Sequence, residues 1–205
     1  MKSNLGTLLY AATLGTVCAL LLTASAEFTR PYQDANQRAE EIRKVLSTLG
    51  VPMEEGASAM ALLKVFEESV SLEQRDERDI YTYASADAPD QVLAIAVQFS
   101  GPGLWGPITG FVALEPDLQT IRGVTIVKQE ETPGLGGEIA TEPFCAQFVG
   151  KATKNASGRV GIAINGTGGE LADTQVNGIT GATITCDKLQ ATINEALTVI
   201  LEENQ

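Results

Sequence analysis

The sequence has no histidine among its 205 residues. This absence excludes histidine as a general base, the Ser-His and Cys-His catalytic pairs, and zinc or haem sites that use histidine ligands. Chemistry carried out by this chain must therefore use carboxylates, hydroxyls, a few thiols or a bound cofactor. From the residues alone, we predict neither a catalytic residue nor a metal site.

Cysteine is scarce as well, with three in the chain. Cys18 lies in an apolar run, so Cys145 and Cys186 are the remaining candidates for a disulfide. Because cysteine often serves as a small apolar filler, the sequence favours two free, partly buried thiols. It does not settle whether the two side chains have the geometry that a bridge needs.

Basic residues are few: 14 Lys and Arg face 26 Asp and Glu, for a net charge of -12. Binding to a phosphate backbone depends on basic residues that displace counterions, so this charge argues against a nucleic-acid partner. Hydrophobic residues make up 44% and charged residues 20% of the chain, which is ordinary for a globular protein. The length allows one domain with a core and an appendage.

A long uncharged segment lies near the N-terminus. Residues 5–26 are mostly apolar and long enough to cross a bilayer as a helix. We therefore expect a membrane anchor at 5–26 that follows a short cytoplasmic segment at 1–4. The alternative is a cleaved secretory signal, because Lys2 precedes the run and Ala24-Ser25-Ala26 resembles a cleavage site. Both interpretations export the remainder of the chain.

Residues 27–79 are expected to form a helical region between the anchor and the main domain. Apolar residues at helical spacing predict an amphipathic helix over 34–49, which Gly50 and Pro52 end. A second short helix carries Leu62, Leu63, Phe66 and Val70. The mainly acidic segment 73–79 is expected to be a solvated link.

The main domain is predicted to span residues 80–205. Strand patterns at 92–99, 108–115 and 121–128 are separated by turn residues that suit an antiparallel meander. A short helix near 144–149, a strand at 159–164 and a glycine-rich loop through Glu170 follow. The last helix, near 185–202, has an apolar stripe. The expected fold class is α+β, an antiparallel sheet with packed helices, preceded by one transmembrane helix.

The segment just before the last predicted helix is suited to a phosphate. It reads Thr180-Gly181-Ala182-Thr183-Ile184-Thr185, after Asn177. Backbone N–H groups at a helix N-terminus are unpaired and the helix dipole is positive there, which favours an anion. The small residues allow a ligand to approach the backbone. Taken alone, the segment is also explained by hydroxyls that cap the helix.

Two further loops have unusual compositions. The segment Glu131-Thr132-Pro133-Gly134-Leu135-Gly136-Gly137 follows a predicted strand, and its glycines leave a surface on which a flat ring could pack. Residues 101–107 place the sole tryptophan, Trp105, in a Gly/Pro turn. By itself the 131–137 pattern is more typical of an ordinary loop, and the 101–107 turn fits a capped core as well as a contact surface.

Together the three segments resemble one family. The stretches GLWGPITGFVAL, ETPGLGGEI and NGITGATIT occur in an order typical of NqrC, the FMN-binding subunit of the sodium-translocating NADH:quinone reductase. The related RnfG protein of the Rnf electron-transport complex has a similar pattern. GLWGP and ETPGLGGEI are more similar to NqrC, whereas the length of the chain is closer to that of RnfG.

The resemblance implies a covalently bound FMN. In the family the last Thr of the motif carries the FMN phosphate as an ester, and this residue corresponds to Thr183. The motif also implies cofactor contacts from neighbouring residues and from the ETPGLG loop: Thr180, Gly181, Ala182, Thr185, Asn177, Glu131, Thr132, Gly134, Leu135 and Gly136. Asn177 stands where the family usually has Asp.

The resemblance also implies a function. The chain would be an electron-transfer subunit of an oxidoreductase complex, not catalytic on its own, with other membrane subunits as partners and a flavin transferase for maturation. It would sit in the bacterial cytoplasmic membrane as a single-pass protein with its FMN domain on the periplasmic side. The alternatives are an RnfG protein and a non-redox exported binding module whose glycine-rich loops shape a surface.

Overall fold

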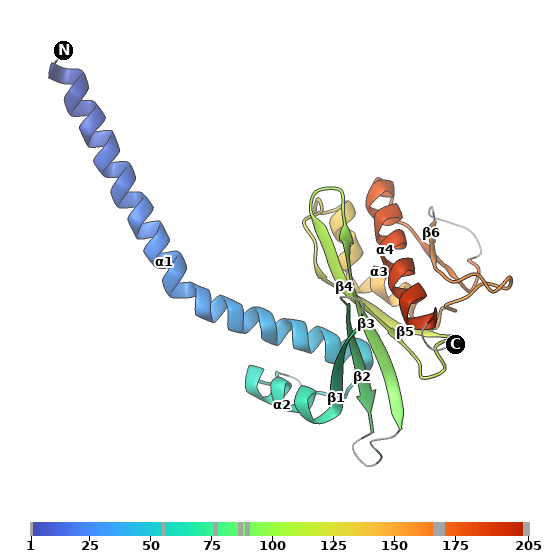
Figure 1. Cartoon of the computed structure of the whole chain (residues 1–205). Helices are drawn as coiled ribbons and strands as arrows, with labels where there is room; N and C mark the ends of the chain where they lie inside the picture. Colours follow the sequence, from blue (N-terminus) through green and yellow to red (C-terminus); the bar gives the residue numbers. More distant parts are fainter. Residues whose placement is uncertain are drawn as a thin grey trace. The chain divides into compact units, whose positions relative to one another are not determined.

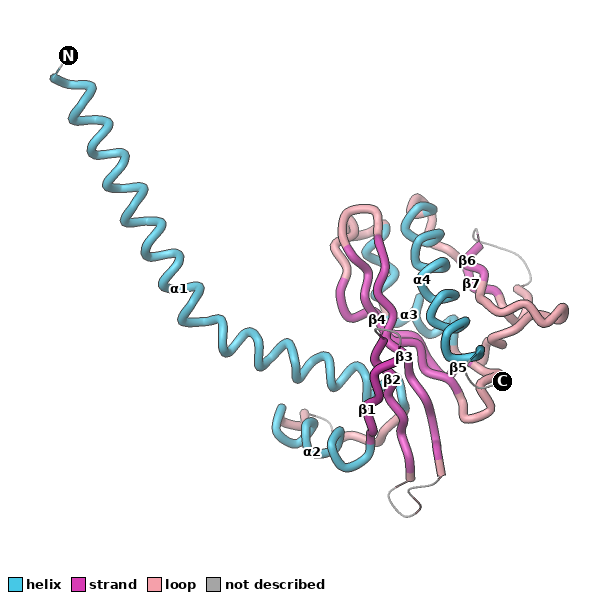
Figure 2. The backbone as a smooth tube through the Cα atoms, in the orientation of Figure 1, coloured by secondary structure: helices cyan, strands magenta, loops and turns pink. Residues whose placement is uncertain are grey.

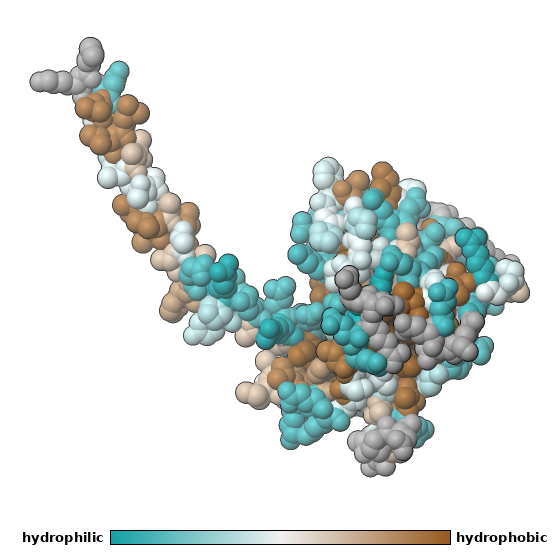
Figure 3. All heavy atoms as spheres, in the orientation of Figure 1, coloured by the Kyte–Doolittle hydropathy of each residue, from teal (hydrophilic) through white to brown (hydrophobic). Residues whose placement is uncertain are grey.

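The apolar N-terminal run belongs to one long helix in the computed structural model of this chain. Helix α1, Lys2–Leu49, continues through Pro31, so the helix expected over 34–49 is the second part of α1. The mean hydropathy of an 18-residue window is 1.9, with none of that window buried. Hydrophobic side chains cover much of its first half (Figure 3). By length and composition α1 can cross a bilayer, a test that a signal sequence also passes.

The structure describes residues 2–54, 56–75, 78–85, 88, 91–165 and 171–202. It divides into two compact units, Met1–Glu40 and Glu41–Gln205. The second unit contains a sheet with helices on both faces (Figures 1 and 2). Residues 41–79, expected to precede the main domain, therefore contribute to the same unit as the sheet.

A five-stranded antiparallel meander forms the centre of the second unit. Its strands lie in chain order: β1 Val70–Arg75, β2 Arg78–Ala84, β3 Val92–Pro102, β4 Pro107–Leu114 and β5 Ile121–Lys128. The last three match the strands predicted from alternating hydrophobicity. The α+β fold class with an antiparallel sheet is confirmed.

The solvated link predicted at 73–79 is wrong. Glu73 pairs with Ile80 and Gln74 with Asp79, as part of the β1–β2 hairpin. The polar side chains of Glu73 and Gln74 are exposed on an edge strand, where charge and polarity are tolerated and protect the edge from further pairing. Val70, which was predicted as the end of a helix, is instead the first residue of β1 and pairs with Tyr83.

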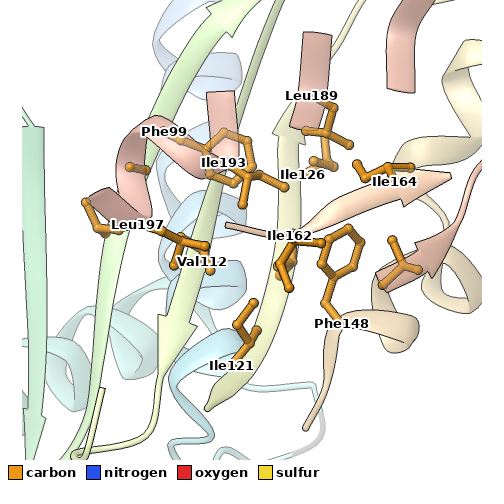
Figure 4. Packing of buried hydrophobic residues seen from close by; sticks show 14 of the residues in the cluster. Phe99, Val112, Ile121, Ile126, Phe148, Ile162, Ile164, Leu189, Ile193 and Leu197 are labelled. Atoms are coloured by element: carbon orange, nitrogen blue, oxygen red, sulfur yellow. The ribbon is translucent and has the colours of Figure 1, made fainter. Parts of the chain in front are cut away.

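The two faces of the sheet bury different side chains. Successive strand residues point to opposite faces, so Val97 and Phe99 of β3 lie in one core cluster, whereas Ala94 and Ala96 lie in the other. The first cluster receives helix α4, Thr183–Glu202. Leu189, Ile193 and Leu197 of α4 pack against the sheet in Figure 4, which confirms the predicted apolar stripe.

The second face is covered by the end of α1 and by α2, Ala59–Ser69. Leu46 and Leu49 of α1 and Leu62 of α2 are almost fully buried there. Tyr81 and Phe111 meet edge to face across this core, with ring centroids 5.4 Å apart, a favourable aromatic geometry. The sheet is thus packed between two hydrophobic layers.

The segment between β5 and α4 contains short elements. These are η1 Gly136–Ala140, α3 Glu142–Cys145, η2 Ala146–Phe148, β6 Ala163–Asn165 and β7 Gln175–Asn177, the last two paired in parallel. The strand predicted at 159–164 is mostly irregular, and only its end belongs to β6. Much of the glycine-rich loop predicted through Glu170 lies outside the described residues.

Candidate functional site

Thr183 is the first residue of α4, and its side chain is exposed. The helix begins two residues earlier than predicted, so the motif threonine belongs to the helix itself. Gly181, with a φ of +80°, turns the chain into the helix, and the Ala182 N–H donates to the Ile179 carbonyl at 3.1 Å. The N–H groups of the first turn lack intrahelical acceptors. Thr183 therefore presents a hydroxyl beside the positive end of a helix.

A hollow of about 310 Å³ lies beside Thr183. It is formed where the turn after β3, the loop after β5 and the start of α4 come together. The lining residues are Leu104, Trp105, Glu131, Thr132, Leu135, Gly136, Gly181, Ala182, Thr183, Ile184 and Thr185. The structure thus brings together the three loops that the sequence singled out.

Large apolar side chains are exposed around this hollow. Trp105 is 70% exposed and Ile184 53%, and Leu104 and Leu135 are also well exposed. Exposed apolar groups that surround a concavity are typical of a binding surface. Sequence reasoning did not assign Leu104, Trp105 or Ile184 to the site, although the tryptophan in a rigid turn was a signal for this region.

Glu131 is buried at the back of the hollow, with an exposed fraction of 5%. Its Oε1 atom accepts from the Leu104 N–H at 2.7 Å and the Trp105 N–H at 3.2 Å, and its Oε2 atom accepts from the Thr185 hydroxyl at 2.7 Å. Burial by itself would raise the pKa of Glu131. These three hydrogen bonds and the positive charge of Lys188 outweigh burial, so the pKa lies below its usual range and the carboxylate is ionised at neutral pH.

The glycines of the 131–137 loop have different roles. Gly134 has a φ of +74° and open space around it, as a turn requires. Gly136 is buried, and a Cβ there would lie 2.6 Å from Thr185 Oγ1 and 2.8 Å from Glu131 Oε2. Gly136 therefore allows the loop to pack closely against α4, and it also lines the hollow.

Not every predicted cofactor contact lies at this hollow. Thr180 lines a neighbouring hollow of about 280 Å³, together with Asn165, Cys186 and Asp187. Thr183 and Gly181 line both hollows. Asn177 and Gly134 line neither of these two. The Asn177 backbone N–H donates to Gln147 Oε1 at 2.9 Å.

The thiols of Cys145 and Cys186 are free. The Cys186 sulfur accepts from the Ile179 N–H at 3.4 Å, directly below the motif turn. Burial raises the pKa of both thiols, which keeps them protonated at neutral pH and poorly nucleophilic. Among the described residues, no group of three or more Cys, Asp or Glu side chains could hold a metal ion.

Comparison with known proteins shows what this part of the chain is similar to. Residues 103–198 match the family model described as FMN-binding domain. The NqrC protein of the Na(+)-translocating NADH-quinone reductase from Haemophilus ducreyi is 27% identical, over 88% of this chain and 84% of that protein. The chain is similar to NqrC over most of its length. The same protein from Vibrio campbellii is 38% identical over 51% of this chain and 41% of that protein.

Solved structures of NqrC share the fold. The structure from Parabacteroides distasonis has a TM-score of 0.66 at 24% identity and covers 82% of this chain and 93% of that chain. The one from Shewanella oneidensis has a TM-score of 0.67 at 21% identity, over 80% and 93%. The predicted resemblance to NqrC is therefore confirmed. These relatives are, by name, subunits of an oxidoreductase complex.

Proposed function

We propose that this chain is a membrane-anchored electron-transfer subunit that carries one FMN on Thr183, within a sodium-translocating NADH:quinone reductase. The observation that supports this most strongly is the position of Thr183. Its hydroxyl is exposed at the N-terminus of α4 and at the edge of an apolar-rimmed hollow, inside the segment that matches the FMN-binding domain.

The residues around the hollow fit the two halves of FMN. The ring system is flat, largely apolar and aromatic, and the exposed side chains of Trp105, Leu104, Leu135 and Ile184 offer it apolar contact. The phosphate is anionic, and Thr183 places it where the dipole and free N–H groups of α4 are favourable. The hollow would hold the ring while the helix end holds the phosphate.

The ester requires an activated donor. Joining a hydroxyl to a free phosphate releases water and is unfavourable in aqueous solution, so a flavin dinucleotide is the chemically suitable donor. Thr183 Oγ1 would form the new bond to the phosphorus beside the flavin ribityl chain, while the pyrophosphate P–O bond would break and the nucleoside monophosphate would leave with that electron pair. A flavin transferase would provide the base that accepts the hydroxyl proton, since the chain has no histidine.

When bound, FMN supplies the electron-transfer chemistry, and the chain supplies binding, orientation and electrostatic tuning. The ionised Glu131 at the back of the hollow would place a negative charge near a ring bound there. The apolar side chains of the rim would exclude water from the face of that ring. Thr183 serves as the attachment point, so the chain needs no catalytic residue of its own.

The anchor and the relatives support a place in a membrane complex. The relatives are subunits of a multi-subunit reductase, so other membrane subunits of that complex would be the electron donor and acceptor. We place residues 1–4 in the cytoplasm, 5–26 in the bacterial inner membrane, and the FMN domain, 80–205, on the periplasmic side together with residues 41–79, which belong to the same compact unit.

The anchor assignment predicts that the full chain stays in membranes during an alkaline carbonate wash. Intact mass should show that residues 1–26 are present. Replacing Leu14 and Leu21 with Asp should prevent insertion, because each charge at a helix centre costs about 3 kcal/mol. A wild-type product that lacks residues 1–26 and is released by the wash would instead identify a cleaved signal.

The proposed function predicts the partners of the native protein. Purification in mild detergent through a tag on the C-terminus should recover other subunits of a sodium-translocating NADH:quinone reductase, and the band of this chain should fluoresce under ultraviolet light after denaturation. Recovery of Rnf subunits would assign it to that complex. A non-fluorescent chain without redox partners would support a binding module and refute the proposal.

A further inference from the structure

The three loops of the hollow meet at a single carboxylate. We propose that Glu131 is a positioning residue, which holds the 103–107 turn and the first turn of α4 in the arrangement that receives the flavin, and does not bind the flavin itself. That the ligand is a flavin rests on the proposed function. The contacts of Glu131 with the turn and with α4 are present in the flavin-free chain.

The hydrogen bonds of Glu131 connect segments that are distant in the sequence. Oε1 accepts two backbone N–H groups of the 103–107 turn, 26 and 27 positions away. Oε2 accepts the hydroxyl of Thr185, 54 positions away on α4. Each carboxylate oxygen is therefore already engaged by the protein. Charge-assisted hydrogen bonds of this kind are about twice as strong as neutral ones.

Two glycines make room for this carboxylate. A Cβ on Gly103 would collide with Glu131 Oε1, and a Cβ on Gly136 would lie 2.8 Å from Oε2. Any side chain at these positions would push the carboxylate away from its donors. Glycine at both positions is thus explained by the close packing around Glu131, independently of any ligand.

The same contacts hold the backbone that carries Trp105. The carboxylate binds the backbone of Leu104 and Trp105, while the indole remains 70% exposed at the rim. Glu131 thereby fixes the backbone from which two of the rim side chains project. Thr185 connects this turn to α4, two residues after Thr183, so the carboxylate also sets the distance between the rim and the attachment point.

The test uses hydrogen–deuterium exchange of the flavin-free full chain in detergent, followed at the amides of Leu104 and Trp105. Glu131→Ala should accelerate their exchange by more than about tenfold, since hydrogen bonds to charged groups are lost. Glu131→Gln keeps an acceptor oxygen and an amide that can donate to Thr185, so it should restore most of the protection. Glu142→Gln, which changes an exposed carboxylate that does not line the hollow, is the matched control and should leave exchange unchanged.

Unchanged exchange in Glu131→Ala would overturn the inference, and so would equal acceleration in Glu131→Gln or in the control. If Glu131→Ala does not fold, Thr185→Val and Thr185→Ser decide: only the valine, which removes the hydroxyl donor, should accelerate exchange. In the flavin-loaded protein, Glu131→Ala should lower the fluorescence anisotropy of a flavin that remains attached. A wild-type protein that takes up no flavin would refute the proposed function and leave the exchange result valid.

Discussion

Thr183→Ala should yield a folded protein with no covalently bound flavin when it is produced together with a flavin transferase. The substitution removes Oγ1, the atom of this chain that would be joined to the flavin phosphate. Thr183 is exposed at the start of α4 and contributes nothing to the buried core, so the fold should persist. In-gel fluorescence after denaturation and intact mass measure the loss, which should be complete.

Two variants provide matched controls for this result. Thr183→Ser keeps a hydroxyl at the same backbone position and should retain at least part of the flavin. Thr180→Ala removes another exposed hydroxyl, three residues earlier, and should leave a fluorescent band because Thr183 is intact. Full flavin incorporation in Thr183→Ala, or its loss only in Thr180→Ala, would show that the attachment point is elsewhere.

Leu189→Ala should destabilise the domain by about 2–5 kcal/mol. Leu189 is fully buried where the N-terminal half of α4 packs on the sheet, and its truncation leaves a cavity beneath the helix that presents Thr183. Urea unfolding of the flavin-free full chain in detergent, followed by circular dichroism, measures the change. Flavin loading in cells should fall along with the folded fraction.

Ala191→Ser is the matched control for this second prediction. Ala191 lies on the exposed side of the same helix, where substitutions usually change stability by less than about 0.5 kcal/mol. A loss of less than about 1 kcal/mol in Leu189→Ala would mean that α4 is not fixed by its apolar stripe. Packing of the apolar stripe would then not explain how α4 positions Thr183.

The central strands and the last helix were predictable because their patterns are local. Strands β3 to β5 alternate between two buried faces, and Leu189, Ile193 and Leu197 repeat at helical spacing. The β1–β2 hairpin was not predictable in this way. Residues 73–79 have the polar composition of a solvated link, and only pairing between neighbouring strands gives 73–75, 78 and 79 an extended structure.

The candidate site was only partly predictable, for a similar reason. The motif around Thr183 and the 131–137 loop have distinctive local compositions, so the sequence singled them out. The inward orientation of Glu131 and the packing role of Gly136 depend on contacts with residues 104, 105 and 185. Such long-range contacts leave no periodic signal, and apolar residues such as Leu104 and Ile184 are typical of cores as well as of rims.

Peptide mapping by mass spectrometry locates the flavin on the chain. The chain is produced with an active flavin transferase, digested, and searched for the peptide that carries flavin phosphate. We expect one modified peptide, containing residues 180–185, with fragmentation that places the group on Thr183. Flavin on a different residue, or none on a protein made beside a transferase that modifies a known substrate, would contradict this expectation.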